Sequence, residues 1–131
     1  MCSSDLVAAN GHDPARSTCA DADVNAFLRE QLKAGAQYDA IVLDPPKFAP
    51  SAAHADRAAR AYKDINLLGF KLLKPGGHLM TYSCSGGVSA DLFQKVVAGA
   101  ALDAGVDAQI LRRLGRARII RCRCIFRKGI I

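Results

Sequence analysis

The segment YDAIVLDPP, residues 38–46, decides how this chain of 131 residues is built. Apolar and β-branched residues run from Tyr38 to Leu43 and end at two prolines, which is typical of a buried strand. Continuous apolar runs of this length are favoured in parallel sheets, whose faces are covered by helices. The segment therefore predicts a strand over about residues 38–43 and helices on either side of it in the chain.

Helical and strand patterns alternate on both sides of this segment. Helices are predicted over 24–35, where Gly35 ends the helix, and over about 89–104, where Ser89 is a good N-cap. A strand is predicted over 106–114 by alternation. A further helix is predicted after the strand over 38–43, because apolar residues recur there at the spacing of one helix face: Tyr62, Ile65, Leu68 and Leu72.

The segment KPGG (74–77) predicts the end of that helix, and HLMTYS (78–83) predicts the next strand. Strand, crossover helix and strand in alternation predict an α/β domain with a parallel sheet. Ligands bind such sheets at the carboxyl ends of the strands, and neighbouring strands lie about 5 Å apart. Because polar clusters follow both strands, we expect Asp44 and Cys84 to meet across one cleft.

Asp44 is followed by two prolines, which have a fixed φ and no N–H donor. The result is a stiff bend that presents one carboxylate and free carbonyl acceptors. Such a bend can hydrogen-bond the donor edge of a planar heterocycle, for example the amino group of a nucleobase. A simple strand terminator explains the same residues equally well, and the sequence leaves both interpretations open.

Cys84 lies where the second strand gives way to a glycine-rich turn. The amides of residues 85–87 and of the next helix favour a thiolate, which can attack an electron-poor carbon. The competing interpretation is a small buried hydrophobic residue, as most free cysteines are. His54 and His78 are the nearest candidate bases, but His78 is expected at the opposite end of the sheet.

The composition of the chain limits the classes of protein to which it can belong. The net charge is +6, but the whole excess lies in residues 116–131, so the remainder of the chain is neutral. Five cysteines without metal-ligand spacing indicate no metal site. No apolar run approaches the roughly 18 residues of a membrane span, and the N-terminus has no signal-peptide pattern. A cytoplasmic protein with reduced thiols, and no membrane partner, is the expectation.

Three segments together resemble a known family: YDAIVLDPPKF, RAYKDINLLGFKLLKPGGHLMTYSCSG and SADLFQKVVAGAALDAG. In this order and spacing they resemble class I S-adenosylmethionine-dependent methyltransferases, and specifically the ribosomal RNA large-subunit cytosine-C5 methyltransferases. LKPGG before a strand is general to class I, whereas YKDIN together with SCSG is the specific part. The resemblance implies a Rossmann-like sheet, S-adenosyl-L-methionine as cofactor and ribosomal RNA as partner.

The resemblance also implies roles for individual residues. Cys84 matches the nucleophile that adds to C6 of cytosine, so that C5 can attack the methyl sulfonium. Asp44 and Pro45 match the turn that holds the base edge, and they are expected to border the cofactor as well. Asp23, expected after a preceding strand, matches the residue that binds the adenine amino group. Further substrate contacts are expected from Pro46, Lys47 and Lys63.

For Lys47 and Lys63, solvated surface side chains are the competing interpretation. Tyr62 is expected in the core and not as a stacking platform for a base.

The chain departs from the family at both ends. The glycine-rich loop after the family's first strand and the acid after its second have no counterpart, so we expect a partial sheet and weak cofactor binding by this chain alone. Residues 7–114 are interpreted as a partial catalytic domain, and residues 1–6 as a non-native leader. Residues 115–131 are interpreted as a basic tail read out of frame, because a one-base shift relates them to the family's ending.

Two other functions remain open. An amino-group methyltransferase of a base or protein also uses Asp/Asn-Pro-Pro, but needs no cysteine at position 84 and has an aromatic residue where Lys47 stands. A cationic RNA-binding fragment would act through residues 116–131 and bind with a steep salt dependence.

Overall fold

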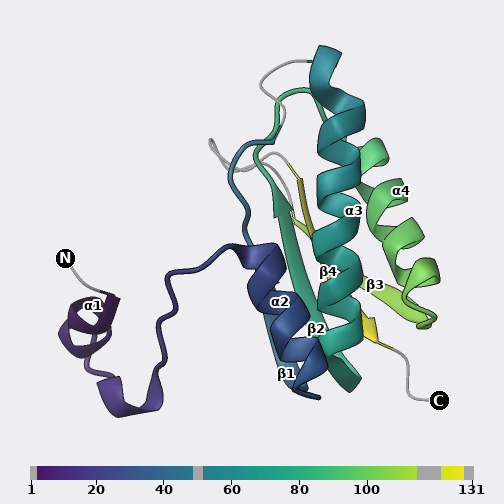
Figure 1. Cartoon of the computed structure of the whole chain (residues 1–131). Helices are drawn as coiled ribbons and strands as arrows, with labels where there is room; N and C mark the ends of the chain where they lie inside the picture. Colours follow the sequence, from purple (N-terminus) through teal and green to yellow (C-terminus); the bar gives the residue numbers. More distant parts are fainter. Residues whose placement is uncertain (1–2, 49–51, 115–121, 129–131) are drawn as a thin grey trace.

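A computed structural model describes residues 3–48, 52–114 and 122–128, and its centre is a four-stranded sheet of order β1-β2-β4-β3. Strand β1 (Tyr38–Leu43) pairs in parallel with β2 (Leu73–Ser83). Strand β4 (Cys122–Lys128) pairs antiparallel with β2 and with β3 (Ala108–Leu114). The predicted α/β class with a parallel strand pair is therefore confirmed (Figure 1).

The helices of the domain lie on one face of this sheet (Figure 1). They are α2 (Val24–Lys33), α3 (Ala55–Leu72) and α4 (Ala90–Asp103), close to the ranges predicted from periodicity. Ser89 caps α4 as predicted, because its side chain accepts from Leu92 N at 3.2 Å. The cap of α2 was not predicted: the side chain of Asp23 accepts from Ala26 N at 2.9 Å. Such caps satisfy amides that have no partner within the helix.

Strand β2 begins earlier than predicted, at Leu73. The KPGG segment was expected to lie between helix and strand, but it forms part of β2 as an irregularity in the ladder. Tyr38 pairs with Leu73, whereas Ala40 already pairs with His78. Gly76 has a φ of 78°, which accommodates the extra residues without a Cβ penalty. Pairing with β1 thus decides where β2 starts.

The hydrophobic core lies between the sheet and helices α3 and α4. Its largest members are fully buried: Tyr62, Phe70, Leu73, Leu79, Phe93 and Val97. A second cluster of Leu28, Leu68 and Leu72 fixes α2 against α3. On the opposite face of the sheet Val42 is 57% exposed, so the helices of the described residues cover one face only.

The N-terminal segment forms a short helix α1 (Ser3–Ala9) and a 3₁₀ turn η1 (Pro14–Arg16), which lie apart from the sheet (Figure 1). The strand expected before Asp23 is absent: residues 17–22 have no regular structure. A 3₁₀ turn η2 (Ala52–His54) precedes α3. Within the described ranges, every helix is too short or too polar to cross a membrane.

Candidate functional site

The candidate site lies where β1 and β2 end. Leu43 and Thr81 are register partners in the two parallel strands, so the segments that follow them leave the sheet at the same edge. Asp44-Pro45-Pro46 follows β1, and Cys84 follows β2 directly. The predicted juxtaposition of these two polar clusters at one edge is what the topology produces.

The side chain of Cys84 contacts the backbone of the Asp-Pro-Pro turn. Its half-buried thiol donates to the carbonyl oxygen of Pro45, with Sγ and O 3.8 Å apart. This oxygen is one of the acceptors that the two prolines were expected to present. Among the described residues no amide of the following turn donates to Sγ, so the carbonyl is the thiol's hydrogen-bonding partner.

The two serines that flank Cys84 are fixed by Tyr62. The Tyr62 hydroxyl lies 2.8 Å from Ser85 Oγ and accepts from Ser83 Oγ at 2.9 Å. Ser85 Oγ also accepts from Phe48 N at 3.0 Å, which connects the turn after β2 to the segment after β1. Sequence periodicity placed Tyr62 in the core correctly, but it gave no sign of this hydroxyl network. The alternating serines of SCS are the only signal that could have suggested it.

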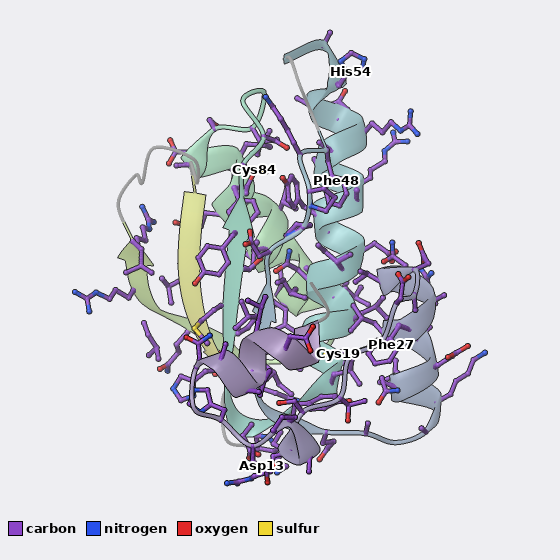
Figure 2. All side chains as sticks on the ribbon, turned by 90° about the vertical axis from the view of Figure 1, so that its left-hand side faces the viewer. Asp13, Cys19, Phe27, Phe48, His54 and Cys84 are labelled. Atoms are coloured by element: carbon purple, nitrogen blue, oxygen red, sulfur yellow. The ribbon has the colours of Figure 1, made fainter. Side chains whose placement is uncertain are left out.

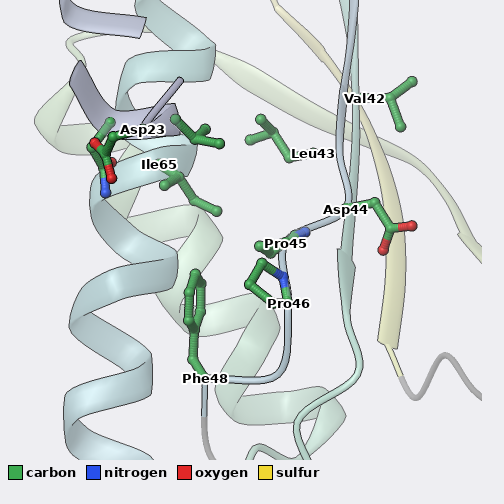
Figure 3. A pocket seen from close by; sticks show the side chains of 10 residues that line it. Asp23, Val42, Leu43, Asp44, Pro45, Pro46, Phe48 and Ile65 are labelled. Carbon is green, nitrogen blue, oxygen red and sulfur yellow. The ribbon is translucent and has the colours of Figure 1, made fainter. Parts of the chain in front are cut away.

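A cavity of about 380 Å³ opens beside this edge, between the start of α2 and the end of β1 (Figure 3). Apolar side chains make most of its wall: Val24, Val42, Leu43, Pro45, Pro46, Phe48 and Ile65. Its polar residues are Asp23, Asn25 and Asp44. The Oδ1 atom of Asn25 is buried and has no hydrogen-bonding partner among the described residues.

The predicted cofactor residue Asp23 therefore does line a cavity, although no strand precedes it. Asp44 lines the same cavity, but its carboxylate points to the other side of the chain from Asp23, as Figure 3 shows. Asp44 is exposed, and the described residues give it no ion-pair partner. The structure thus places Asp23, Asp44, Pro45 and Pro46 around one cavity, with the two carboxylates directed apart.

The predicted phosphate contacts lie outside this cavity wall. Lys47 is exposed on the turn between Pro46 and Phe48. Lys63 faces α4, where its Nζ forms an ion pair with Asp103 Oδ2 at 2.8 Å. His54 lies at the start of α3, at the far end of that helix from the sheet core (Figure 2). His78 lies well before the carboxyl end of β2 and is exposed.

The cavity suits a planar heterocycle with hydrogen-bond donors on one edge. Its walls are apolar, and its polar side chains at the start of α2 offer carboxylate and amide oxygens as acceptors. The unpaired Asn25 Oδ1 specifically lacks a donor, which an exocyclic amino group would supply. An adenine ring, whose exocyclic amino group donates, fits these acceptors and walls, and so the residues present fit the adenosyl part of S-adenosylmethionine.

No family model matches the chain. It is 54% identical over 111 residues to "Ribosomal RNA large subunit methyltransferase I" of Shewanella amazonensis, covering 85% of this chain and 28% of that protein. It is 56% identical over 108 residues to the protein of the same name from Aeromonas hydrophila, covering 82% and 27%. The chain thus spans about a quarter of the length of these relatives.

Two solved structures have the same fold. One is assigned as a SAM-dependent methyltransferase from Streptococcus mutans, with a TM-score of 0.76, 14% identity, and coverage of 92% of this chain and 33% of that one. The other is assigned as a methyltransferase and is complexed with SAH, with a TM-score of 0.77, 16% identity, and coverage of 95% of this chain and 34% of that one. The sheet described above is therefore part of a class I methyltransferase fold, as predicted.

Proposed function

We propose that this chain, homologous over most of its length to part of the large-subunit ribosomal RNA methyltransferases I, is part of the catalytic domain of an S-adenosylmethionine-dependent enzyme that methylates C5 of a cytosine in that RNA. The observation that carries the proposal is the contact between Cys84 and Pro45 at the edge of the cavity. A cysteine is needed there for C5 chemistry, whereas methylation of an amino group needs none.

In the proposed reaction the thiolate of Cys84 forms a bond to C6 of the cytosine, and the displaced electron pair makes C5 nucleophilic. S-adenosylmethionine would supply an electrophilic methyl group. After methylation C5 loses its proton to solvent, the electron pair of that C–H bond forms the C5–C6 double bond, and the C6–Sγ bond breaks to regenerate the Cys84 thiolate. The Asp44-Pro45 turn would hold the base edge, with the Asp44 carboxylate accepting from a donor on the ring.

Asp23 and Asn25 would hold the adenine amino group, and Asp44 and Pro45 would border the cofactor. Pro46 and Lys47 would contact the RNA, and Lys63 would reach phosphate only by leaving Asp103. A cationic side chain would be needed to hold the methionine carboxylate of the cofactor. Among the described residues, none lines this cavity. We therefore expect this chain alone to bind the cofactor weakly.

The test is Cys84→Ser in the full-length protein, with Cys19→Ser as the matched control, because Cys19 is exposed and lies away from Cys84 (Figure 2). Methyl transfer to large-subunit ribosomal RNA should be lost in Cys84→Ser, while binding of S-adenosylhomocysteine is retained. RNA containing 5-fluorocytosine should stay covalently attached to the wild-type enzyme, because C5 then has no proton to lose.

Unchanged activity in Cys84→Ser, with the methyl group on an exocyclic nitrogen, would favour the amino-group methyltransferase instead. RNA binding without any methyl transfer by the full-length protein would favour a purely RNA-binding role.

A further inference from the structure

We propose that Tyr62 is a positioning residue, whose buried hydroxyl sets the placement of Cys84 against the Asp-Pro-Pro turn. Its effect on methyl transfer rests on the proposed function, but its effect on the geometry and reactivity of the Cys84 thiol does not. The inference arises from a hydrogen-bond loop that encloses position 84.

The loop is closed by four polar atoms on three residues. Ser83 Oγ donates to the Tyr62 hydroxyl, so the hydroxyl's own proton can go to Ser85 Oγ. The amide of Ser85 donates back to Ser83 Oγ at 3.3 Å. Cys84 lies between the two serines, and so its backbone is held from both sides by one tyrosine.

All three residues are fully buried. A buried hydroxyl that loses its partner is costly, because no water replaces the lost bond. The loop is therefore a stiff support and not a surface contact that solvent could replace. Removing the Tyr62 hydroxyl alone leaves both serines to rearrange.

Tyr62 acts on the other turn as well. Its ring contacts that of Phe48 edge-on, with centroids 4.9 Å apart, and that of Phe93 at 5.3 Å. Phe48 is also tied by its amide to Ser85 Oγ. Because Phe48 lies two positions after Pro46, the hydroxyl and the ring of Tyr62 together fix the Asp-Pro-Pro turn relative to Cys84.

The consequence concerns the reach of the thiol. Sγ lies 3.8 Å from Pro45 O in the described arrangement, and the proposed adduct needs Sγ to approach C6 of a base held by the same turn. Displacements of about 1 Å in such arrangements can lower rates about 100-fold. The Tyr62 hydroxyl is thus expected to affect turnover much more than binding.

The experiment compares Tyr62→Phe with Tyr38→Phe in the full-length protein. Both changes remove one hydroxyl and keep the ring; the Tyr38 hydroxyl bonds to Gln31 Oε1 at 2.7 Å, at the start of β1 and away from the site. The first readout is alkylation of Cys84 by iodoacetamide, measured by mass spectrometry relative to the exposed Cys19 in the same molecule. The second is kcat and KM for methyl transfer.

Tyr62→Phe should change the Cys84-to-Cys19 alkylation ratio several-fold and lower kcat about 10- to 100-fold, with KM for the cofactor within about twofold. Tyr38→Phe should change neither. Ser85→Ala should behave like Tyr62→Phe, and the double variant should be no worse than the more impaired single variant, because both break one network.

The inference would be overturned if both Tyr62→Phe and Ser85→Ala kept the wild-type alkylation ratio and the wild-type kcat. It would also be overturned if the decreases in kcat of the two single variants multiplied in the double variant. If Tyr62→Phe fails to fold, Ser85→Ala decides alone. If the wild-type protein does not methylate cytosine, the proposed function fails, while the alkylation ratio still decides the positioning role.

Discussion

The thiol of Cys84 lies 3.8 Å from the carbonyl oxygen of Pro45, although 39 positions separate the two residues in the chain. Two parallel strands bring them together, because β1 and β2 end at the same edge of the sheet. The thiol thus faces the turn proposed to hold the substrate base, and not the amides of its own turn. This relationship makes the chemistry of Cys84 depend on the tertiary structure around it.

Thr81→Val should stabilise the protein. Thr81 is fully buried, and its Oγ1 has no hydrogen-bonding partner among the described residues. Replacing an unpaired buried hydroxyl by a methyl group of similar shape removes a desolvation penalty, so the free energy of unfolding should rise by about 1 kcal/mol. Urea denaturation measures this. Ser83→Ala is the contrast: its hydroxyl bonds to Tyr62, and its loss should destabilise.

Gly77→Ala should destabilise the protein, whereas Gly99→Ala should not. A Cβ at Gly77 would lie 2.9 Å from Lys74 O and 3.1 Å from Asp39 O, both backbone atoms that cannot move cheaply. A Cβ at Gly99 meets only the flexible Lys63 side chain, at 3.6 Å. Because alanine favours the helical conformation more than glycine does, Gly99→Ala in α4 should raise the free energy of unfolding by about 0.5–1 kcal/mol. Thermal unfolding of both variants gives the comparison, and equal shifts in Tm would contradict it.

Asp23→Asn and Asp23→Ala should separate the capping role of Asp23 from its proposed role toward adenine. Asparagine keeps the N-cap of α2, so Asp23→Asn should leave stability nearly unchanged, whereas Asp23→Ala should cost about 1 kcal/mol. Both should weaken binding of S-adenosylhomocysteine to the full-length protein, since Asn has one acceptor oxygen and the cap uses it. Calorimetry measures the affinity; wild-type binding by Asp23→Asn would remove Asp23 from the cofactor site.

Lys47→Ala should weaken RNA binding more than Lys63→Ala does. Lys47 is exposed on the turn beside the cavity, whereas the charge of Lys63 is offset by Asp103. Loss of one phosphate contact should reduce the slope of log affinity against log salt by about 1. Filter binding across a salt series measures this slope. An identical slope for Lys47→Ala and wild type would exclude a phosphate contact.

Removing the ion pair between Lys63 and Asp103 should change the stability of the protein very little. The side chains of Lys63 and Asp103 are 44% and 51% exposed. Exposed pairs of this kind contribute at most about 1 kcal/mol. Asp103→Asn should therefore leave the free energy of unfolding within about 0.5 kcal/mol of wild type, so that effects on RNA binding are not confounded by unfolding.

Local patterns were enough to predict most elements of the fold. The apolar run of β1, the cap Ser89, the helix end at Gly35 and the periodicity around Tyr62 all act within a few residues, and the structure places these elements close to where the patterns put them. The start of β2 was missed because pairing with β1 draws the KPGG segment into the ladder. Nothing in the basic composition of residues 116–131 pointed to β4, which pairs with the preceding strand β3 and also with β2, a strand far away in the chain.

For the site, the sequence by itself determined which chemistry is present: a cysteine after one strand, a carboxylate and two prolines after another. Strand order and pairing decided that they meet at one edge. Only the tertiary structure decided that Cys84 faces Pro45 O, that Asp44 points away from Asp23, and that Tyr62 holds both serines beside the thiol. These contacts join residues 20 to 40 positions apart, and no local pattern specifies a side-chain orientation across such a distance.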